Sequence, residues 1–152
     1  MRYPLTPYDR CSFCDDLSGG RECAFVAQNE LAAAEIDLRQ YEAGAMLVIP
    51  RAHRESILDI TPEELEAVYR LAQQVGRAAT RALGAVGMNV YQNNGIKAGQ
   101  HEPHFHVHVV PRYEASDPDR LFRQRDYPAV PLHEQHGLAA RIRSALQESP
   151  AA

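Results

Sequence analysis

The chain contains no tryptophan, a single lysine and no long uninterrupted hydrophobic run. Its net charge is −4 and its 16 basic residues form no basic stripe, so nucleic-acid binding through the phosphate backbone is not expected. No segment approaches the roughly 18 apolar residues of a membrane span, and the N-terminus lacks the apolar core of a secretory signal. We therefore expect a cytoplasmic protein with neither a nucleic-acid nor a membrane partner.

Length and composition predict one domain over residues 1–152. A chain of 152 residues with 45% hydrophobic content is long enough to build a single core. The recognisable motifs lie within residues 11–112. The tail, residues 113–152, begins with a charged, irregular segment and shows a helix-like pattern only at residues 136–147.

Short runs rich in strand-forming residues alternate with turn signals along the chain. We expect strands at residues 23–28, 31–38, 45–49 and 88–92, and Pro50 should end the third of them. Residues 10–20 have the composition of a turn-rich entry. Strands joined by short loops around one long helix predict an antiparallel sheet covered on one face, which is an α+β fold.

The clearest helix signal begins at Thr61, a candidate N-cap. Pro62 suits the first helical position, Glu64 completes a capping box, and Gly84 or Gly87 can end the helix. The apolar residues at helical spacing are Leu65, Val68, Leu71, Ala72, Val75, Ala79 and Leu83. This stripe predicts the buried face of the helix and not a functional site.

Three histidines, His104, His106 and His108, occupy every second position of a segment that favours a strand and is closed by Pro111. Alternation along a strand directs all three imidazoles to one face. At roughly 3.3 Å per residue, His104 and His108 lie about 13 Å apart, too far to share one metal ion with His106. We interpret His106 as a working histidine with a different neighbour on each side. A chance cluster on a solvated strand and a two-histidine metal site are the alternatives.

Residues 104–110 resemble the signature of the histidine triad (HIT) family, His-φ-His-φ-His-φ-φ with φ apolar. Residues 47–53 are similar to the family's strand-and-histidine segment, and Asn93 precedes Gln100 by seven residues as in the family's phosphate loop. The resemblance implies a sheet of about five strands with one long helix and a short C-terminal helix, usually in a homodimer. It also implies cleavage or transfer of purine nucleoside monophosphates by attack on the α-phosphorus.

The resemblance assigns roles to individual residues. His106, the middle histidine, matches the nucleophile of the family. A histidine suits this role, because neutral imidazole is nucleophilic near pH 7 and leaves well from a covalent nucleotidyl-histidine. The candidate donors to the phosphate oxygens are Asn93, Gln100 and His108, and the backbone of Gly99 is free to approach closely. Asp37 lies where family members hold a ribose. We expect His101 to contact or protonate the leaving group.

The predicted catalytic set is therefore His106, His108, Gln100 and His101. Simpler roles remain open for part of the site. Asn93 and Gln100 would also suit a loop that their side chains complete, and Asp37 would suit an exposed strand end. At Ala45 many family members have a histidine, which puts any role of that histidine in doubt here.

Cys11 and Cys14 form a Cys-x-x-Cys pair, which in a cytoplasmic protein marks redox chemistry or zinc more often than a structural disulfide. A thioredoxin-like pair opens a helix after a strand, whereas this pair lies in the turn-rich entry. One branch of the HIT family binds zinc with such a pair and two histidines. The resemblance thus implies a closed structural zinc site of Cys11, Cys14, His53 and His104; free thiols are the alternative. We expect Cys23 to be a buried small side chain.

Three classes of function stay open at this point. The first class is an enzyme of the HIT type, and such enzymes hydrolyse a dinucleoside polyphosphate, hydrolyse an adenosine phosphoramidate, or pass the nucleotide to phosphate or another acceptor. A nucleotide-binding or partner-binding module with little turnover is the second class. A zinc hydrolase that uses the triad histidines as ligands is the third. No organic cofactor is expected in any of them.

Overall fold

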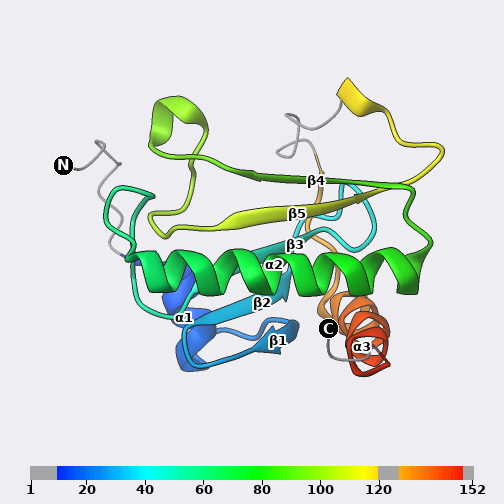
Figure 1. Cartoon of the computed structure of the whole chain (residues 1–152), viewed down its shortest axis with the longest axis horizontal. Coiled ribbons are helices and arrows are strands. Elements are labelled where there is room, and N and C mark those ends of the chain that lie inside the picture. The colour runs from blue at the N-terminus through cyan, green and yellow to red at the C-terminus, as the bar shows by residue number, and fades with distance from the viewer. Residues whose placement is uncertain (1–9, 120–126, 149–152) are drawn as a thin grey trace.

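Five strands form one antiparallel sheet in the order β1-β2-β3-β5-β4 in the computed structural model, which describes residues 10–119 and 127–148 (Figure 1). The strands are β1 (Phe25–Gln28), β2 (Ala32–Ile36), β3 (Met46–Pro50), β4 (Gly87–Gln92) and β5 (Val107–Arg112). The helices are α1 (Ser12–Ser18), α2 (Pro62–Leu83), the 3₁₀ turn η1 (Ile96–Ala98) and α3 (Leu132–Gln147). The predicted α+β fold is confirmed.

The two faces of the sheet have different cover. Helix α2 runs across one face (Figure 1), where alternate residues of β2 such as Ala34 and Ile36 join the main core with Val68 and Val75. On the other face Phe13 of α1 packs in a smaller cluster with the remaining alternate residues, Ala33, Leu47 and Ile49. This second face is only partly covered by apolar packing, and it carries the polar side chains described below.

The predicted capping box of α2 is present. The Thr61 hydroxyl accepts a hydrogen bond from the Glu64 amide at 3.2 Å, and the Glu64 carboxylate accepts one from the Thr61 amide at 3.0 Å. Arg54 also donates to Glu64 at 2.7 Å. The helix ends at Gly84, whose φ of 71° suits glycine. The predicted stripe is buried at Val68, Leu71, Ala72, Val75 and Ala79, and Leu65 and Leu83 pack against it.

The strand of the histidine row is shorter at its start and longer at its end than predicted. β5 begins at Val107, so only His108 of the three histidines lies in the ladder. The pairing of β3 with β5 stops at Val48 and Val107, while Pro50 still pairs with Ala32 of β2. The Pro50 carbonyl lies 2.8 Å from Nε2 of His104. Pro111 fits inside β5, because the pairing with β3 stops at Val109 and leaves one side of β5 unpaired there.

Two helix predictions also need correction. Residues 10–20 contain the helix α1 and are not a simple turn-rich entry. Helix α3 begins at Leu132, four residues before the predicted start at residue 136.

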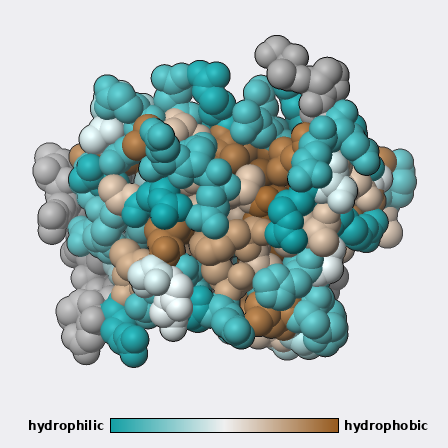
Figure 2. Space-filling view, turned by 90° about the horizontal axis from the view of Figure 1, so that it is seen from below, coloured by the Kyte–Doolittle hydropathy of each residue, from teal (hydrophilic) through white to brown (hydrophobic). Residues whose placement is uncertain are grey.

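The surface is mostly hydrophilic on the face that Figure 2 shows. Figure 2 shows one face of the molecule, on which groups of hydrophobic residues lie among mostly hydrophilic ones. Among the described helices, none combines the length and apolar character that crossing a bilayer requires. That residues 1–152 make one domain stays a prediction.

Candidate active site

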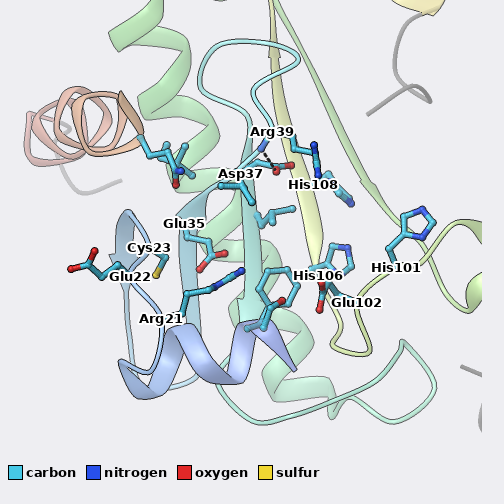
Figure 3. Close-up of a pocket in the computed structure, with 16 residues that line it drawn as sticks. Arg21, Glu22, Cys23, Glu35, Asp37, Arg39, His101, Glu102, His106 and His108 are labelled. Carbon is cyan, nitrogen blue, oxygen red and sulfur yellow. Dashed lines mark hydrogen bonds between the residues drawn. The ribbon is translucent and has the colours of Figure 1, made fainter. Parts of the chain in front are cut away.

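A pocket of about 340 Å³ opens on the sheet face opposite α2 (Figure 3). The sheet register builds its floor, because Glu35 of β2 pairs with Leu47 of β3, and Leu47 pairs with His108 of β5. Paired residues point to the same face, so these three side chains form a row across the sheet. His106 and His101 come from the segment before β5 and line the same pocket.

His106 is held in one orientation by the backbone. Its Nδ1 lies 2.7 Å from the carbonyl oxygen of His104, which makes Nδ1 the protonated nitrogen and leaves the lone pair on Nε2. This carbonyl is the acceptor that the sequence did not identify. Burial lowers the pKa of His106, so the imidazole is neutral near pH 7. A neutral, oriented imidazole in a pocket is suited to nucleophilic attack.

His108 lies next to His106, with 4.9 Å between the ring centroids. The ring of Tyr91 on β4 stacks on His108 at 4.4 Å and 7°. Burial lowers the pKa of His108, and its Nδ1 has no hydrogen-bond partner among the described residues. His108 therefore brings a neutral ring with a free polar atom to the side of His106.

Asp37 lies at the end of β2 and lines the pocket with the histidines. It is buried and accepts a hydrogen bond from the Arg39 amide at 3.0 Å. Burial raises the pKa of Asp37 to about 6. The alternative of an exposed strand-end residue is therefore wrong. The exposed side chain of His101 stands apart from the others at the edge of the same pocket (Figure 3).

The residues of the predicted phosphate loop do not line this pocket. Gln100 is fully buried, and its amide accepts from the Gly95 backbone at 2.7 Å and donates to the Glu102 carbonyl at 2.9 Å. Asn93 donates to the carbonyl of Gly99 at 3.5 Å. Gly99 has a φ of +87°, which favours glycine. The side-chain amide of Gln100 thus forms its hydrogen bonds with loop backbone. This agrees with the interpretation that Gln100 completes the loop.

The four predicted metal ligands lie together, outside the pocket. Cys11, Cys14, His53 and His104 have their ligand atoms within 4.8 Å of one another. The His104 Nδ1 lies 3.4 Å from the Cys11 sulfur, and the His53 Nδ1 lies 3.3 Å from the Cys14 sulfur. Zinc bond lengths in a tetrahedron require sulfur–nitrogen separations of roughly 3.6 Å. The donor set and its spacing fit a closed tetrahedral site.

The surroundings of this cluster orient its ligands. The Pro50 carbonyl lies 2.8 Å from Nε2 of His104 and leaves Nδ1 for a metal. Cys11 is the N-cap of α1, and its sulfur accepts from the Cys14 amide at 3.4 Å. The cysteine pair therefore does open a helix, contrary to the prediction, although this helix has only seven residues. In the described part of the chain, neither His106 nor His108 belongs to a group of three candidate ligands.

A polar group at the far end of the pocket was not predicted from the sequence. Glu35 is 3% exposed and lies near Asp16 and Cys23, and Arg21 makes an ion pair with Asp16. Burial raises the pKa of Glu35 to about 8. The alternation of β2 was the available signal, because Glu35 stands two residues before Asp37 and shares its face. Cys23 is only half-buried and lines the pocket, so its prediction as a core residue is wrong.

Residues 19–115, which include all five strands of the sheet and the pocket histidines, match the sequence model of the HIT domain. The chain belongs to the HIT domain family. This HIT protein is 34% identical over 109 residues to "Protein hit" of Bacillus subtilis. The aligned residues cover 72% of this chain and 75% of that protein. It is 32% identical over 102 residues to adenosine 5′-monophosphoramidase hnt1 of Schizosaccharomyces pombe, over 67% of this chain and 74% of that one.

A solved structure supports the same assignment. The HIT protein superposes on a zinc-bound histidine triad family protein from Mycobacterium smegmatis with a TM-score of 0.76 and 31% identity. The match covers 91% of this chain and 94% of that chain. The fold predicted from the histidine row is thus that of the HIT family.

Proposed function

We propose that this HIT protein is a nucleotide hydrolase or nucleotidyl transferase that cleaves at the α-phosphate of a nucleoside phosphoramidate or dinucleoside polyphosphate. The observation that carries the proposal is the 2.7 Å contact between Nδ1 of His106 and the His104 carbonyl, which leaves Nε2 as a nucleophile in the pocket. A similar protein is named an adenosine 5′-monophosphoramidase, in agreement with this chemistry.

In the proposed reaction, the Nε2 lone pair of His106 attacks the α-phosphorus. A phosphorus–nitrogen bond forms to the histidine, while the bond from phosphorus to the leaving oxygen or nitrogen breaks. The leaving group takes the electron pair and a proton, for which the rim residue His101 is the proposed donor. The His104 carbonyl stabilises the proton on Nδ1 throughout. Water or another acceptor then attacks phosphorus and gives its proton back to His101, while the phosphorus–nitrogen bond breaks, which releases the nucleotide and returns His106 with its Nε2 lone pair.

The remaining predicted residues take supporting roles in this proposal. His108 contacts the phosphate oxygens, and Asp37 accepts from the ribose hydroxyls. Asn93 and Gly99 lie outside the pocket and support the loop beside it, where Asn93 donates to the Gly99 carbonyl. Gln100 contributes by holding the loop, because its amide bonds loop backbone.

We propose that the cluster of Cys11, Cys14, His53 and His104 holds a structural zinc ion. Two thiolates and two imidazoles suit zinc, and all four protein positions of a tetrahedron are filled. When bound, the ion would fasten α1 to the segment that carries His106. The similar histidine triad family protein from Mycobacterium smegmatis is zinc-bound, which supports the proposal.

We also propose a homodimer formed through β4, the last strand of the sheet. Val90 on β4 is 47% exposed and Tyr69 on α2 is 42% exposed. Both line a groove between α2 and β4. An exposed strand edge beside apolar side chains is suited to pairing with a second copy of the chain. The predicted cytoplasmic location stays a prediction.

The test of the function is intact-protein mass spectrometry after a brief acid quench with adenosine or guanosine 5′-phosphoramidate. Wild type should gain the mass of one nucleoside monophosphate, and His106→Ala should not. His136→Ala is the matched control, because His136 is an exposed histidine of α3 and should leave the adduct intact. Nucleotide binding without adduct or turnover would favour the binding module instead.

A further inference from the structure

We propose that Glu35 reads the base of the bound nucleotide and selects guanine over adenine. The inference rests on the proposed nucleotide substrate and extends it to a substrate class. It starts from a polar group that the proposed reaction does not use, in a part of the pocket remote from the nucleophile.

The pocket has a phosphate end and a second end. His108, Asp37, Glu35 and Cys23 follow one another across Figure 3, and all four line the same cavity. The register places Glu35 two strands away from His108, or roughly 10 Å at the usual strand spacing. In a nucleotide the ribose joins the phosphate to the base. With the phosphate at His106 and the ribose at Asp37, the base lies toward Glu35.

Glu35 is a buried carboxyl group that makes a hydrogen bond with the Cys23 thiol but has one oxygen without a donor in the part of the chain that the structure describes. It is 3% exposed, and its Oε2 has no hydrogen-bond partner among the described residues. A buried polar atom without a partner is costly, so such an atom in a pocket points to a ligand that supplies the missing contact. The thiol of Cys23 and the carboxylate of Asp16 lie close to Glu35.

A metal ion is a weaker explanation of this group. Arg21 donates to both carboxylate oxygens of Asp16 through Nε and a terminal nitrogen. A cation at this place would have to displace the Arg21 guanidinium. The Arg21 guanidinium also attracts the charge of Glu35, but it donates to Asp16 and leaves Oε2 of Glu35 for a ligand.

The chemistry of a carboxylate favours guanine. An ionised carboxylate offers two acceptor oxygens and no donor. Guanine presents two adjacent donors, the ring N1–H and the exocyclic amino group, whereas adenine presents an amino donor beside a ring nitrogen that accepts. Burial is also the main reason that the pKa of Glu35 is raised, and two N–H donors would stabilise the charged form and lower it.

Calorimetric titration with GMP and AMP, together with kcat/KM for guanosine and adenosine 5′-phosphoramidates, tests the inference. Wild type should prefer guanine by roughly tenfold or more in both measurements. Glu35→Gln should lose or reverse the preference, because its amide offers one donor and one acceptor and so matches adenine. Glu30→Gln is the matched control, because Glu30 is an exposed glutamate in the turn between β1 and β2 and is not among the residues that line the pocket.

The outcomes separate this inference from the proposed function. Equal affinity for both nucleotides, tighter binding of AMP, no binding of either, or an unchanged preference in a folded Glu35→Gln variant would each overturn the guanine assignment. Absence of the covalent adduct would overturn the proposed reaction, yet the binding titrations would still decide the role of Glu35. Thermal unfolding of each variant shows whether it is folded.

Discussion

The imidazole of His106 is oriented by the backbone carbonyl of His104, whose own side chain belongs to the predicted metal site. One residue thus links the predicted metal ligands to the proposed nucleophile. Phe13 makes a second link, since its ring lies 5.7 Å from the ring of His104 and 5.3 Å from that of His106. Disturbing the cysteine and histidine cluster should therefore affect both stability and the chemistry at His106.

Removal of the metal should destabilise the protein. Zinc analysis of wild type should give about one ion per chain, and Cys14→Ser should lose it. Chelation should lower the free energy of unfolding by roughly 4 kcal/mol relative to protein with free zinc at 1,000 times its Kd. Cys23→Ser lies outside the cluster and should keep its zinc. Full zinc content in Cys14→Ser would contradict the ligand assignment, and turnover in the folded, zinc-free protein would exclude a zinc hydrolase.

Asp37 should make the protein less stable at neutral pH. Burial raises its pKa from about 4 to about 6, so the folded state binds the proton more tightly than the unfolded chain. The free energy of unfolding should fall as the pH rises through this window, by about 3 kcal/mol at most. Asp37→Asn should be more stable than wild type at pH 7.5, with a difference that vanishes below about pH 4. Urea unfolding at several pH values measures this, and a constant difference would count against it.

Tyr91 should support the nucleophile through His108. Its ring stacks on the imidazole of His108, and its hydroxyl lies 3.3 Å from that of Tyr41. Tyr91→Leu should lower kcat/KM by roughly 3- to 10-fold, since a stacked aromatic pair contributes about 0.5–1.5 kcal/mol. Tyr91→Phe keeps the ring and should remain close to wild type. Equal loss in both variants would assign the effect to the hydroxyl and not to the stack.

A charge on β4 should dissociate the proposed dimer. Val90→Glu would introduce a carboxylate between two strand edges, where its burial without a partner is unfavourable. Analytical ultracentrifugation should give a dimer for wild type and a monomer for Val90→Glu. Leu31→Glu is the control, because Leu31 is 43% exposed on the turn before β2, at the other side of the sheet. A monomeric wild type, or a dimeric Val90→Glu, would contradict the interface.

The sequence predicted the parts of the structure that local signals determine. The capping box at Thr61 and Glu64 and the apolar stripe of α2 needed only the order of residues. Helix α1 was missed because it is seven residues long and is held by contacts distant in sequence, such as the packing of Phe13 on Leu47. A helix of this length depends on tertiary packing, which a local pattern does not reveal.

The site was predicted unevenly for the same reason. His106 and the metal ligands were identified by a motif. Tyr91 was not, because its position over His108 depends on the register between β4 and β5. Gln100 has a side chain that suits phosphate, yet its amide meets backbone carbonyls brought in by the fold of the loop. Residue type indicated the chemistry, whereas pairing and loop closure determined which groups face the pocket.

The match to the family ends at residue 115, but the hydrophobic core does not. Helix α3 lies beyond that point, and its Ala139, Ile142 and Ala145 are buried in the same core as α2. Arg143 of α3 also donates to the carbonyl of Phe25 at 2.6 Å, which joins the two ends of the described chain. A protein that ends at residue 115 would expose to water the core residues of β1 and β2 that α3 covers. We therefore expect the minimal folding unit to extend through residue 147, so truncation studies should use that limit.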